Sequence, residues 1–309
     1  MTISNNRQLG GAVTGRFAPS PTGPLHFGSL VAALGSYLLA RNNGGQWLLR
    51  IEDLDPPRVV PGAADEMIRL LEQLGFEWDS EVIYQSRRSD YYRQVLQQLR
   101  DQQLVFDCSC SRREILLSAP HPGEEGPIYP GLCRQGPVGT RAERAVRLRV
   151  ADRRIVYCDQ VFGLQQQSLP LEVGDFVLRR ADGLFAYQLA VVADDIDSGV
   201  TQVVRGADLL TSTPRQIYLY QCLQESQPEY YHLPLALGAD QQKLSKRHGS
   251  CGVVTARNGS LAIWHALRFL GQPIPEVLRQ APSRQQLDWA RLHFSVANIS
   301  TSPQSAPSF

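Results

Sequence analysis

Only two of the 31 Lys and Arg residues in this chain are lysines, and both stand in one five-residue string, KLSKR, at Lys243 and Lys246. Lysine carries a compact point charge on a flexible stem, whereas arginine presents a rigid planar fork. A chain that uses arginine almost everywhere else therefore indicates a need for point charges here, such as the binding of a phosphate chain. Chance placement in a lysine-poor chain is the alternative.

A second string, RFAPSPTGPLHFGSL at residues 16–30, joins an expected strand to an expected helix through prolines and glycines. His26 and Gly28 stand where the helix begins, and a helix N-terminus attracts phosphate through its free N–H groups and its dipole. Gly28 lets a nucleotide approach the backbone, and His26 can donate hydrogen bonds to phosphate oxygens. For a lone histidine in this position, the alternative is a capping or packing role.

Three of the six cysteines, Cys108, Cys110 and Cys133, gather in one stretch of the chain. In a reducing compartment such a cluster favours metal ligation over disulfide bonds. Three thiolates suit tetrahedral zinc, which takes four ligands. His121 and Tyr129 are the nearby candidates for the fourth ligand, and ligand softness favours the histidine. Reduced cysteines without a metal are the alternative.

The elements that must position these groups alternate between strands and helices. We expect strands at residues 12–18 and 47–53 and helices at 62–76 and 90–103, a rhythm typical of a parallel sheet with helical crossovers. From residue 108 to 172 this pattern is replaced by a Pro/Gly-rich loop and two strand-like stretches, which indicates an inserted module.

The expected fold is α/β, with a Rossmann-type parallel sheet, an inserted zinc-containing module and a short C-terminal helical region. The expected divisions are the first half of the Rossmann-type domain at 10–107, the inserted module at 108–172, the second half with the KLSKR string at 173–250, a helical region at 251–297 and a disordered tail at 298–309.

Composition narrows the class of protein further. The chain has 309 residues, 43% of them hydrophobic and 20% charged, with a net charge of +1, which excludes a collagen, a disulfide scaffold and a wholly disordered chain. Its longest apolar runs fall short of the roughly 20 residues that span a bilayer. The polar N-terminus lacks the pattern of a secretory signal. We therefore expect a cytoplasmic, monomeric protein with no membrane partner, and any RNA partner must be inferred from motifs.

The two strings together resemble the HIGH and KMSKS signatures of class I aminoacyl-tRNA synthetases, with HFGS at residues 26–29 and KLSKR at 243–247. The form RFAPSPTGxLHxG is close to the glutamyl subgroup, and the resemblance extends over roughly residues 16–250. It implies a HUP-like catalytic domain that uses ATP, with Mg²⁺, to convert L-glutamate to glutamyl-adenylate. Ser29 replaces the final His of the signature, a departure common in the glutamyl branch.

The resemblance also implies roles for single residues. The implied catalytic residues are His26, Lys243 and Lys246, and the implied ATP ligands are His26, Gly28, Ser29 and Lys246. The implied glutamate site comprises Arg16, Phe17, Ala18, Pro19, Ser20, Glu52 for the α-amino group, Tyr187 and Arg205. Arginine suits the side-chain carboxylate because it can pair with it bidentately. The family's CxC…YxxxC pattern favours Tyr129 over His121 as the fourth ligand of a structural Zn²⁺.

Only 62 residues follow Arg247, too few for the anticodon-binding domain of a full glutamyl-tRNA synthetase. The resemblance therefore favours a truncated branch of the family that transfers glutamate to queuosine in the anticodon of tRNA(Asp). Three alternatives stay open: a short glutamyl-tRNA synthetase that charges the 3′ end of tRNA(Glu), a non-catalytic RNA-binding paralogue, and a small-molecule nucleotidyltransferase.

Overall fold

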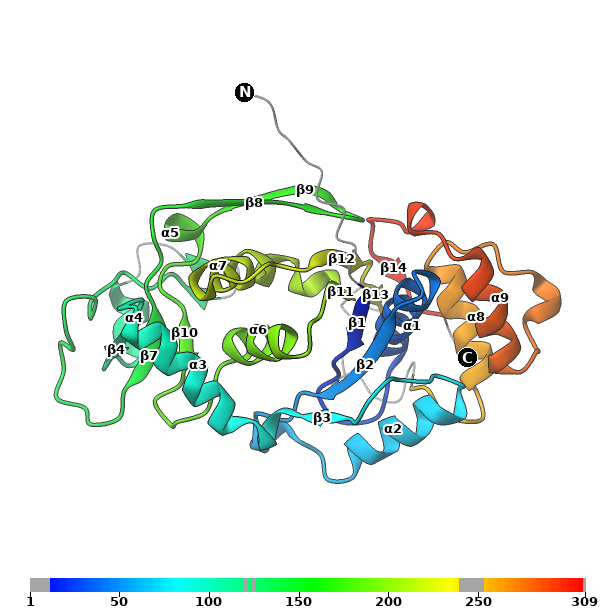
Figure 1. Cartoon of the computed structure of the whole chain (residues 1–309), viewed down its shortest axis with the longest axis horizontal. Coiled ribbons are helices and arrows are strands. Elements are labelled where there is room, and N and C mark those ends of the chain that lie inside the picture. The colour runs from blue at the N-terminus through cyan, green and yellow to red at the C-terminus, as the bar shows by residue number, and fades with distance from the viewer. Residues whose placement is uncertain (1–11, 119–121, 124–125, 239–252, 308–309) are drawn as a thin grey trace.

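A seven-stranded sheet forms the centre of the computed structural model, which describes residues 12–118, 122–123, 126–238 and 253–307 (Figure 1). In spatial order its strands are β3 (Ile83–Tyr84), β2 (Gln46–Ile51), β1 (Thr14–Phe17), β11 (Gln202–Gly206), β12 (Glu229–Leu233), β8 (Arg154–Asp159) and β9 (Gly163–Ser168). All neighbours are parallel except β8 and β9, which form an antiparallel hairpin at one edge. The predicted α/β class with a mostly parallel sheet is confirmed.

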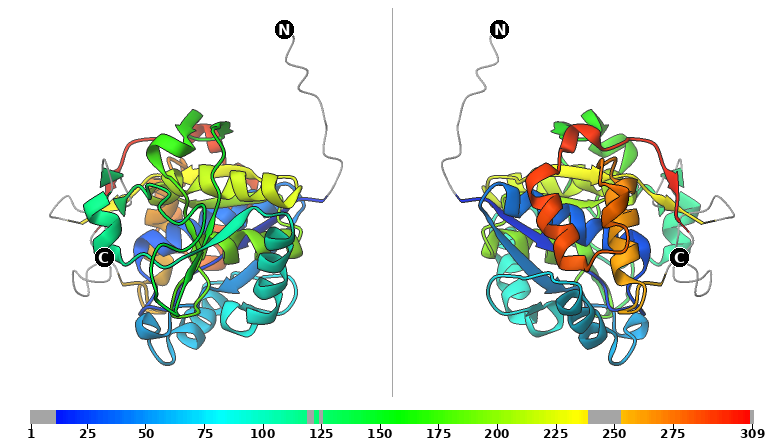
Figure 2. Two further views of the ribbon diagram at one scale, coloured as in Figure 1. Left: turned by 90° about the vertical axis from the view of Figure 1, so that its left-hand side faces the viewer. Right: turned by 90° about the vertical axis from the view of Figure 1, so that its right-hand side faces the viewer.

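Helices cover both faces of this sheet. On one side α1 (Phe27–Asn42) packs against the sheet, and three further helices share its apolar core, with α8 and α9 packed on α1: α2 (Ala63–Gln73), α8 (Gly259–Phe269) and α9 (Ser283–His293). The other face packs against α3 (Ser89–Asp101), α6 (Tyr187–Asp197) and α7 (Thr213–Leu223). The right-hand view of Figure 2 shows α8 and α9 side by side. None of the described helices is long and apolar enough to cross a bilayer.

The central strand β1 marks the point where the chain changes direction across the sheet. Its two neighbours are β2, reached through α1, and β11, which comes much later in the sequence. In open α/β sheets, ligands bind beyond the carboxyl ends of the strands at such a switch point. Side chains alternate along a strand, so that Phe17 lies in the α1 core while Arg16 contacts α6. The α6 face of the sheet is therefore the one that carries charge near the switch point.

A smaller antiparallel sheet lies at the end of the molecule opposite α8 and α9 (Figure 1). Its strands are β10 (Val177–Arg179), β7 (Ala145–Leu148) and β4 (Val105–Cys108), and around it lie α4 (Arg112–Ser118), α5 (Leu169–Glu172) and the short strands β5 (Pro122–Gly123) and β6 (Gly126–Pro127). This sheet takes strands from outside residues 108–172, whereas β8 and β9, inside that range, extend the main sheet. The alternating burial of β8 suits a strand with one wet face near a sheet edge.

The prediction of a disordered tail is wrong for residues 298–307. Ile299 is buried, and β14 (Gln304–Ser305) pairs in parallel with β13 (Ala236–Leu237). The Gln304 N–H donates to the Leu235 carbonyl at 3.0 Å, and the Ala306 N–H donates to the Leu237 carbonyl at 2.7 Å. Backbone pairing needs no apolar side chains, so Ser/Pro-rich composition did not prevent it. The tail thus supports the strand that precedes the segment containing Lys243 and Lys246, which itself lies outside the described residues.

We predict that Ala306→Pro destabilises the protein by about 1 kcal/mol, because proline removes the N–H that bonds to Leu237. Ser305→Pro is the matched control, since the N–H of the intervening residue in a parallel strand points away from the partner. Urea unfolding of both variants measures the difference. Equal stability of the two variants would contradict the pairing of β14 with β13.

Candidate active site

Buried polar side chains gather where the parallel strands end. Arg16 lies near the carboxyl end of β1, Arg205 near that of β11, His232 near that of β12 and Asp159 at the end of β8, and each is at most 5% exposed. Register pairing places Arg205 directly beside His232. Buried charged groups require partners. The partners of each group therefore define what this part of the molecule can bind.

Asp195 of α6 binds two buried arginines at once. Arg16 Nε lies 3.2 Å and Arg50 Nη1 lies 2.7 Å from Asp195 Oδ1. Burial alone would raise the pKa of Asp195, but Arg16 and Arg50 outweigh burial and hold that pKa below its usual value. Asp195 thus offsets part of the positive charge of both guanidinium groups beneath the strand ends, and Asp194 and Glu52 lie near Arg50 as well. Arg16 is thus paired with a carboxylate of the chain itself.

The neighbouring carboxylate, Asp194, joins α6 to α3 and to the loop before it. It accepts hydrogen bonds from Gln85 at 2.7 Å, from Arg88 Nε at 2.7 Å and from the Tyr92 hydroxyl at 2.8 Å. Arg50 Nε lies 3.8 Å away. These contacts hold α6 in one position on the sheet, and α6 in turn carries Tyr187 at its first turn.

Glu52, directly after β2, is a further carboxyl group beside these arginines, and its pKa is raised. Its backbone N–H donates to the Pro19 carbonyl at 2.9 Å, and its side chain lies 3.6 Å from Arg50 Nη2. Burial raises the pKa of Glu52 to about 7, and Arg50 and Arg16 offset only part of this rise. An approaching cation would favour the ionised form. Glu52 is therefore suited to receive an ammonium group.

Tyr187 and Arg205 complete the group. The Arg205 Nη1 donates to the Tyr187 hydroxyl at 3.3 Å. Burial raises the pKa of the Tyr187 hydroxyl. The charge of Glu52 adds to this rise, and the charges of Arg205 and Arg16 oppose it. The structure thus brings together four residues that the sequence predicted for one site: Arg16, Glu52, Tyr187 and Arg205. We call these four the strand-end site.

Residues 17–20 lie beside the strand-end site but do not all face it. The Phe17 side chain is buried in the α1 core and stacks on Trp47, with ring centroids 6.4 Å apart. Ala18 is half-buried, Pro19 is buried and Ser20 is exposed. Phe17 therefore contributes packing, and Pro19 holds Glu52 through its carbonyl.

Arg205 is also bonded to residues that the sequence did not reveal. Its Nε donates to His232 Nε2 at 3.1 Å, and its Nη2 donates to the Thr213 hydroxyl at 2.8 Å. His232 Nδ1 lies 2.6 Å from Asp159 Oδ2. A chain of polar contacts therefore runs from β8 through β12 to β11 and ends at Tyr187.

Five buried polar residues of this region were missed from the sequence: Arg50, Asp159, Asp194, Asp195 and His232. For some of these residues the sequence did contain a signal of burial. An arginine inside the apolar strand WLLRI and two adjacent acids inside the helix YQLAVVADDID each imply a buried partner. Strand β12 was not predicted at all, so His232 had no assigned environment.

The predicted phosphate-binding residues lie at the start of α1. His26 is the N-cap, and its Nδ1 accepts from the Ser29 N–H at 3.2 Å. A Cβ on Gly28 would lie 3.3 Å from the His26 ring and 3.9 Å from Ala236 Cβ, so glycine keeps this corner open. The capping role considered for His26 is therefore present in the structure, and the ring lies over the helix N-terminus.

Lys243 and Lys246 lie outside the described residues, but the chain on both sides of them is placed. Ala236, on the preceding side, lies near Gly28. On the following side, Val253 forms a bridge with His26, and the Val254 N–H donates to the Leu25 carbonyl at 2.9 Å. Both ends of the lysine-bearing segment therefore meet the N-terminus of α1.

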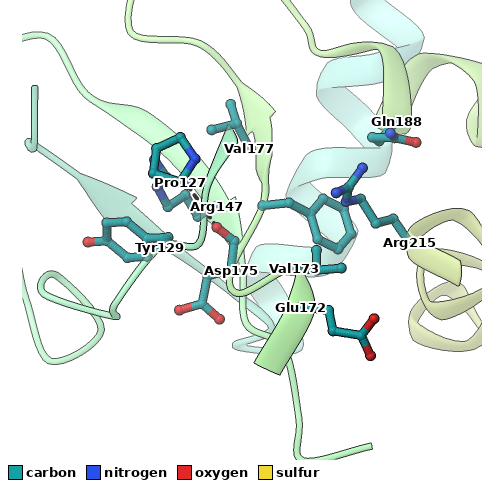
Figure 3. Close-up of a pocket in the computed structure, with 10 residues that line it drawn as sticks. Pro127, Tyr129, Arg147, Glu172, Val173, Asp175, Val177, Gln188 and Arg215 are labelled. Carbon is teal, nitrogen blue, oxygen red and sulfur yellow. Dashed lines mark hydrogen bonds between the residues drawn. The ribbon is translucent and has the colours of Figure 1, made fainter. Parts of the chain in front are cut away.

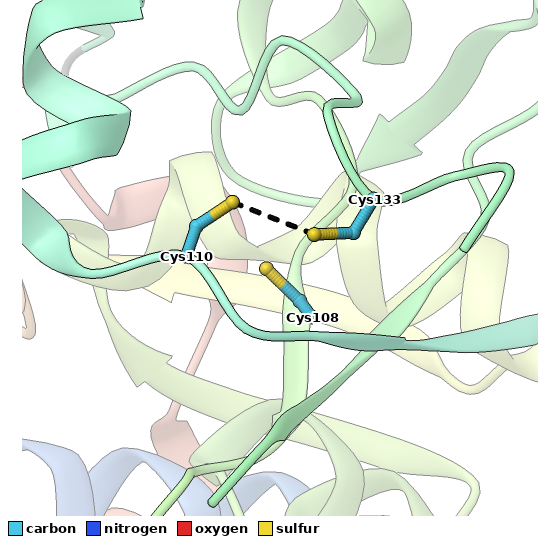
Figure 4. A group of neighbouring side chains, drawn as sticks. All are labelled: Cys108, Cys110 and Cys133. Carbon is cyan, nitrogen blue, oxygen red and sulfur yellow. Dashed lines mark hydrogen bonds between the residues drawn. The ribbon is translucent and has the colours of Figure 1, made fainter. Parts of the chain in front are cut away.

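The three clustered cysteines converge in the small sheet (Figure 4). Their sulfur atoms lie within 4.8 Å of one another, and Cys110 Sγ is 3.5 Å from Cys133 Sγ. The Tyr129 hydroxyl lies 3.4 Å from Cys108 Sγ and 3.6 Å from Cys110 Sγ. Burial and the adjacent thiols raise the pKa of Cys110, so three thiolates can form together only beside a cation. These donors fit a tetrahedral metal ion. His121 lies outside the described residues.

A cavity of about 230 Å³ opens between the small sheet and α7 (Figure 3). Tyr129 lines it, and the Arg147 guanidinium stacks over the Tyr129 ring at 4.0 Å. Arg215 and Gln188 line the opposite side. None of the four residues of the strand-end site lines this cavity, and Tyr129 connects it to the cysteine cluster.

Comparison with known proteins fits this geometry. Residues 12–272 match the family of class I tRNA synthetases (E and Q), catalytic domain. Charged groups at the strand ends beside a helix N-terminus agree with that match, and fold and site together define a class I aminoacyl-tRNA synthetase catalytic domain. The match confirms the resemblance carried by the two sequence strings.

Individual relatives narrow the assignment. The chain is 52% identical over 282 residues to the glutamyl-Q tRNA(Asp) synthetase of Dechloromonas aromatica, covering 91% of this chain and 93% of that one. It is 51% identical over 295 residues to that of Geobacter sulfurreducens, covering 94% of each. The chain belongs to the glutamyl-Q tRNA(Asp) synthetase family. Its fold matches the solved glutamate-tRNA synthetase of Elizabethkingia anophelis with a TM-score of 0.77 at 25% identity, covering 96% of this chain and 68% of that one.

We predict that Asp195→Asn destabilises the fold by about 3 kcal/mol or more, because it leaves Arg16 and Arg50 buried with too little opposing charge. Asp182→Asn, the same chemical change at an exposed ion pair with Arg180, should leave stability near that of the wild type. Urea unfolding measures both. A stable Asp195→Asn protein would show that the cluster does not depend on this carboxylate.

Proposed function

We propose that this protein uses ATP to convert L-glutamate to glutamyl-adenylate and transfers the glutamyl group to queuosine in the anticodon of tRNA(Asp). The observation that carries the proposal is about 50% identity, over more than 90% of the chain, to proteins that bear this activity in their name. The strand-end site supports the choice of amino acid. Because ATP and tRNA are its substrates, we place the reaction in the cytoplasm.

Charge complementarity favours glutamate in the strand-end site. Arg205 offers its Nη1 edge, and Arg16 adds positive charge, so the side-chain carboxylate of the substrate would lie between them. Glu52 would receive the α-ammonium group, whose charge lowers the pKa of this carboxyl from about 7 and keeps it ionised. Tyr187 would close the site through its hydroxyl.

Adenylation would take place between the strand-end site and the start of α1. An oxygen of the glutamate α-carboxylate attacks the α-phosphorus of ATP, the bond to the bridging oxygen breaks, and pyrophosphate leaves. His26, Gly28 and Ser29 would hold the phosphates at the helix N-terminus, and Lys246, assisted by Lys243, would stabilise the charge on the leaving group. Mg²⁺, bound with ATP, would neutralise phosphate charge.

Transfer would follow by attack of a hydroxyl of the queuosine cyclopentenediol on the glutamyl carbonyl carbon. An ester forms, AMP leaves, and the hydroxyl proton passes to solvent or to the phosphate. We propose that the region around the small sheet contacts the anticodon arm. A short glutamyl-tRNA synthetase would instead esterify the 3′ end of tRNA(Glu), and a non-catalytic paralogue would form no adenylate.

The decisive test measures transfer of labelled glutamate to tRNA(Asp) with and without queuosine, beside tRNA(Glu). We expect labelling only of the queuosine-containing tRNA(Asp). The Lys246→Ala variant should lose adenylate formation by roughly two orders of magnitude, the range seen when one transition-state charge contact is removed. Labelling of tRNA(Glu) would favour the short synthetase, and absence of glutamate-dependent pyrophosphate exchange would favour the non-catalytic paralogue.

We also propose that the metal at the cysteine cluster is a structural Zn²⁺ held by Cys108, Cys110, Cys133 and Tyr129. The 3.5 Å between Cys110 Sγ and Cys133 Sγ is close to the edge of about 3.8 Å of a tetrahedron with Zn–S bonds of about 2.3 Å, and all three sulfur atoms lie within 4.8 Å of one another. Four protein ligands would leave no open position, so the ion would stabilise the small sheet rather than take part in adenylation.

We predict one zinc ion per chain in the purified wild type and a loss of metal in Cys110→Ser, measured by atomic emission together with thermal unfolding. Pyrophosphate exchange should persist in Cys110→Ser at temperatures where that protein stays folded. Cys158→Ser, which changes an exposed cysteine outside the cluster, is the control and should keep full metal content. A fully stable wild-type protein without metal would contradict the proposal.

A further inference from the structure

We infer that His232, held by Asp159, is a positioning residue that fixes the Arg205 guanidinium for the side-chain carboxylate of the amino-acid substrate. This inference rests on the proposed function, because it assigns Arg205 to glutamate. His232 touches no substrate group in this scheme and acts through Arg205 alone.

Asp159 orients one edge of the His232 ring, while Arg205, Thr213 and the stacked Tyr230 contact the rest of it. Asp159 Oδ1 accepts from the backbone N–H of Phe162 at 2.8 Å and of Val161 at 3.0 Å, so its carboxylate cannot rotate. Its Oδ2 then lies 2.6 Å from His232 Nδ1, and the backbone N–H of His232 lies 3.2 Å from the same oxygen. Both Asp159 and His232 are at most 1% exposed. The ring orientation is therefore set by the backbone turn that follows β8.

The contact with Arg205 selects one arrangement of protons, and the Thr213 hydroxyl, 3.2 Å from His232 Nε2, can donate to the same lone pair. A carboxylate only accepts, so Nδ1 carries the proton, and a guanidinium only donates, so Nε2 carries the lone pair that Arg205 Nε needs. A doubly protonated ring would direct an N–H at the arginine donors. Burial, followed by the charge of Arg205, lowers the pKa of His232, while Asp159 opposes this shift. The neutral ring is thus the form that fits.

The titratable and charged groups around this ring are Asp159, Arg205, Asp208 and the stacked Tyr230.

This arrangement determines which edge of Arg205 stays available. Nε is bonded to His232 and Nη2 to Thr213, which directs Nη1 to the Tyr187 hydroxyl in the strand-end site. Without the acceptor at Nε2, the Nη2 contacts with the Thr213 hydroxyl and the Leu209 carbonyl hold the guanidinium by one end, and its orientation is less well fixed. An ordered arginine loses less conformational entropy on binding a carboxylate than a mobile one. His232 therefore acts on glutamate affinity and leaves ATP affinity unchanged.

Two substitutions of His232 separate the inferred role from a merely structural one. In His232→Gln, the side-chain amide reaches the position of Nε2 and can still accept from Arg205. In His232→Asn, the shorter amide reaches only the position of Nδ1 and leaves Arg205 without its acceptor. We expect His232→Asn to raise the KM for glutamate by about tenfold or more, since tenfold is the lower end of the range for one hydrogen bond to a charged group. His232→Gln should stay within about twofold of the wild type.

Pyrophosphate exchange measured at varied glutamate and at varied ATP gives the required comparison. Both variants should keep the wild-type KM for ATP and a nearly unchanged kcat. An unchanged KM for glutamate in His232→Asn would overturn the inference. Equal losses in both variants, shared by glutamate and ATP, would also overturn it, because they would show a general structural role.

The pH dependence supplies a second readout. The ratio of glutamate KM in the wild type to that in His232→Gln should be constant above about pH 6.5, the ordinary pKa of histidine. The ratio should rise only at more acid pH, where the wild-type ring takes up a second proton. Using the ratio cancels the titration of Glu52, which both proteins share. A change in the ratio between pH 7 and 8 would contradict a neutral His232.

A measurement on the free wild-type protein keeps this inference distinct from the proposed function. Nitrogen-15 NMR of the histidine rings should show His232 with a protonated Nδ1 and an unprotonated Nε2 at pH 7. A proton on Nε2 would overturn the inference even if glutamate is activated normally. Conversely, a wild type with the expected tautomer but without glutamate-dependent exchange would refute the proposed function alone. If His232→Asn fails to fold, the NMR measurement on the wild type still tests the inference.

Discussion

The pairing of Asp195 with two buried arginines is the constraint on which the strand-end site depends. Arg16 and Arg50 stand on neighbouring strands and point to the same face, so they would repel each other without a shared carboxylate. Helix α6 supplies that carboxylate, and its position on the sheet is therefore fixed by charge as well as by apolar packing. Eight residues earlier, about 12 Å along the helix axis, the same helix places Tyr187 beside Arg205.

Much of the fold and the four residues of the strand-end site could be predicted from sequence, for a clear physical reason. Arg16, Glu52 and Arg205 each follow or end an apolar strand, and the carboxyl ends of parallel strands meet at one edge of a sheet. The partners of these residues could not be predicted in the same way. Asp195 is 179 residues from Arg16 in sequence, and His232 is 27 residues from Arg205 on a strand that local pattern did not reveal. Such pairings are decided by tertiary packing, and local periodicity carries no information on them.

The cysteine cluster and the cavity beside it share one aromatic ring. The Tyr129 hydroxyl points to the sulfur atoms, while its ring carries the Arg147 guanidinium and forms part of the cavity wall. Arg147 is itself held by the Asp175 carbonyl at 2.7 Å, and Asp175 also pairs with Arg134. Any shift of the tyrosine would therefore be transmitted to the cavity and to the start of β10. The small sheet and its neighbours form one connected unit rather than a loop with a metal at its tip.

The parallel pairing of β14 with β13 has a practical consequence for work with this protein. A purification tag or fusion partner joined after residue 309 would be attached only a few residues from a strand that borders the N-terminus of α1. Pulling, crowding or proteolytic trimming at that end would act on the backbone leading to Lys243.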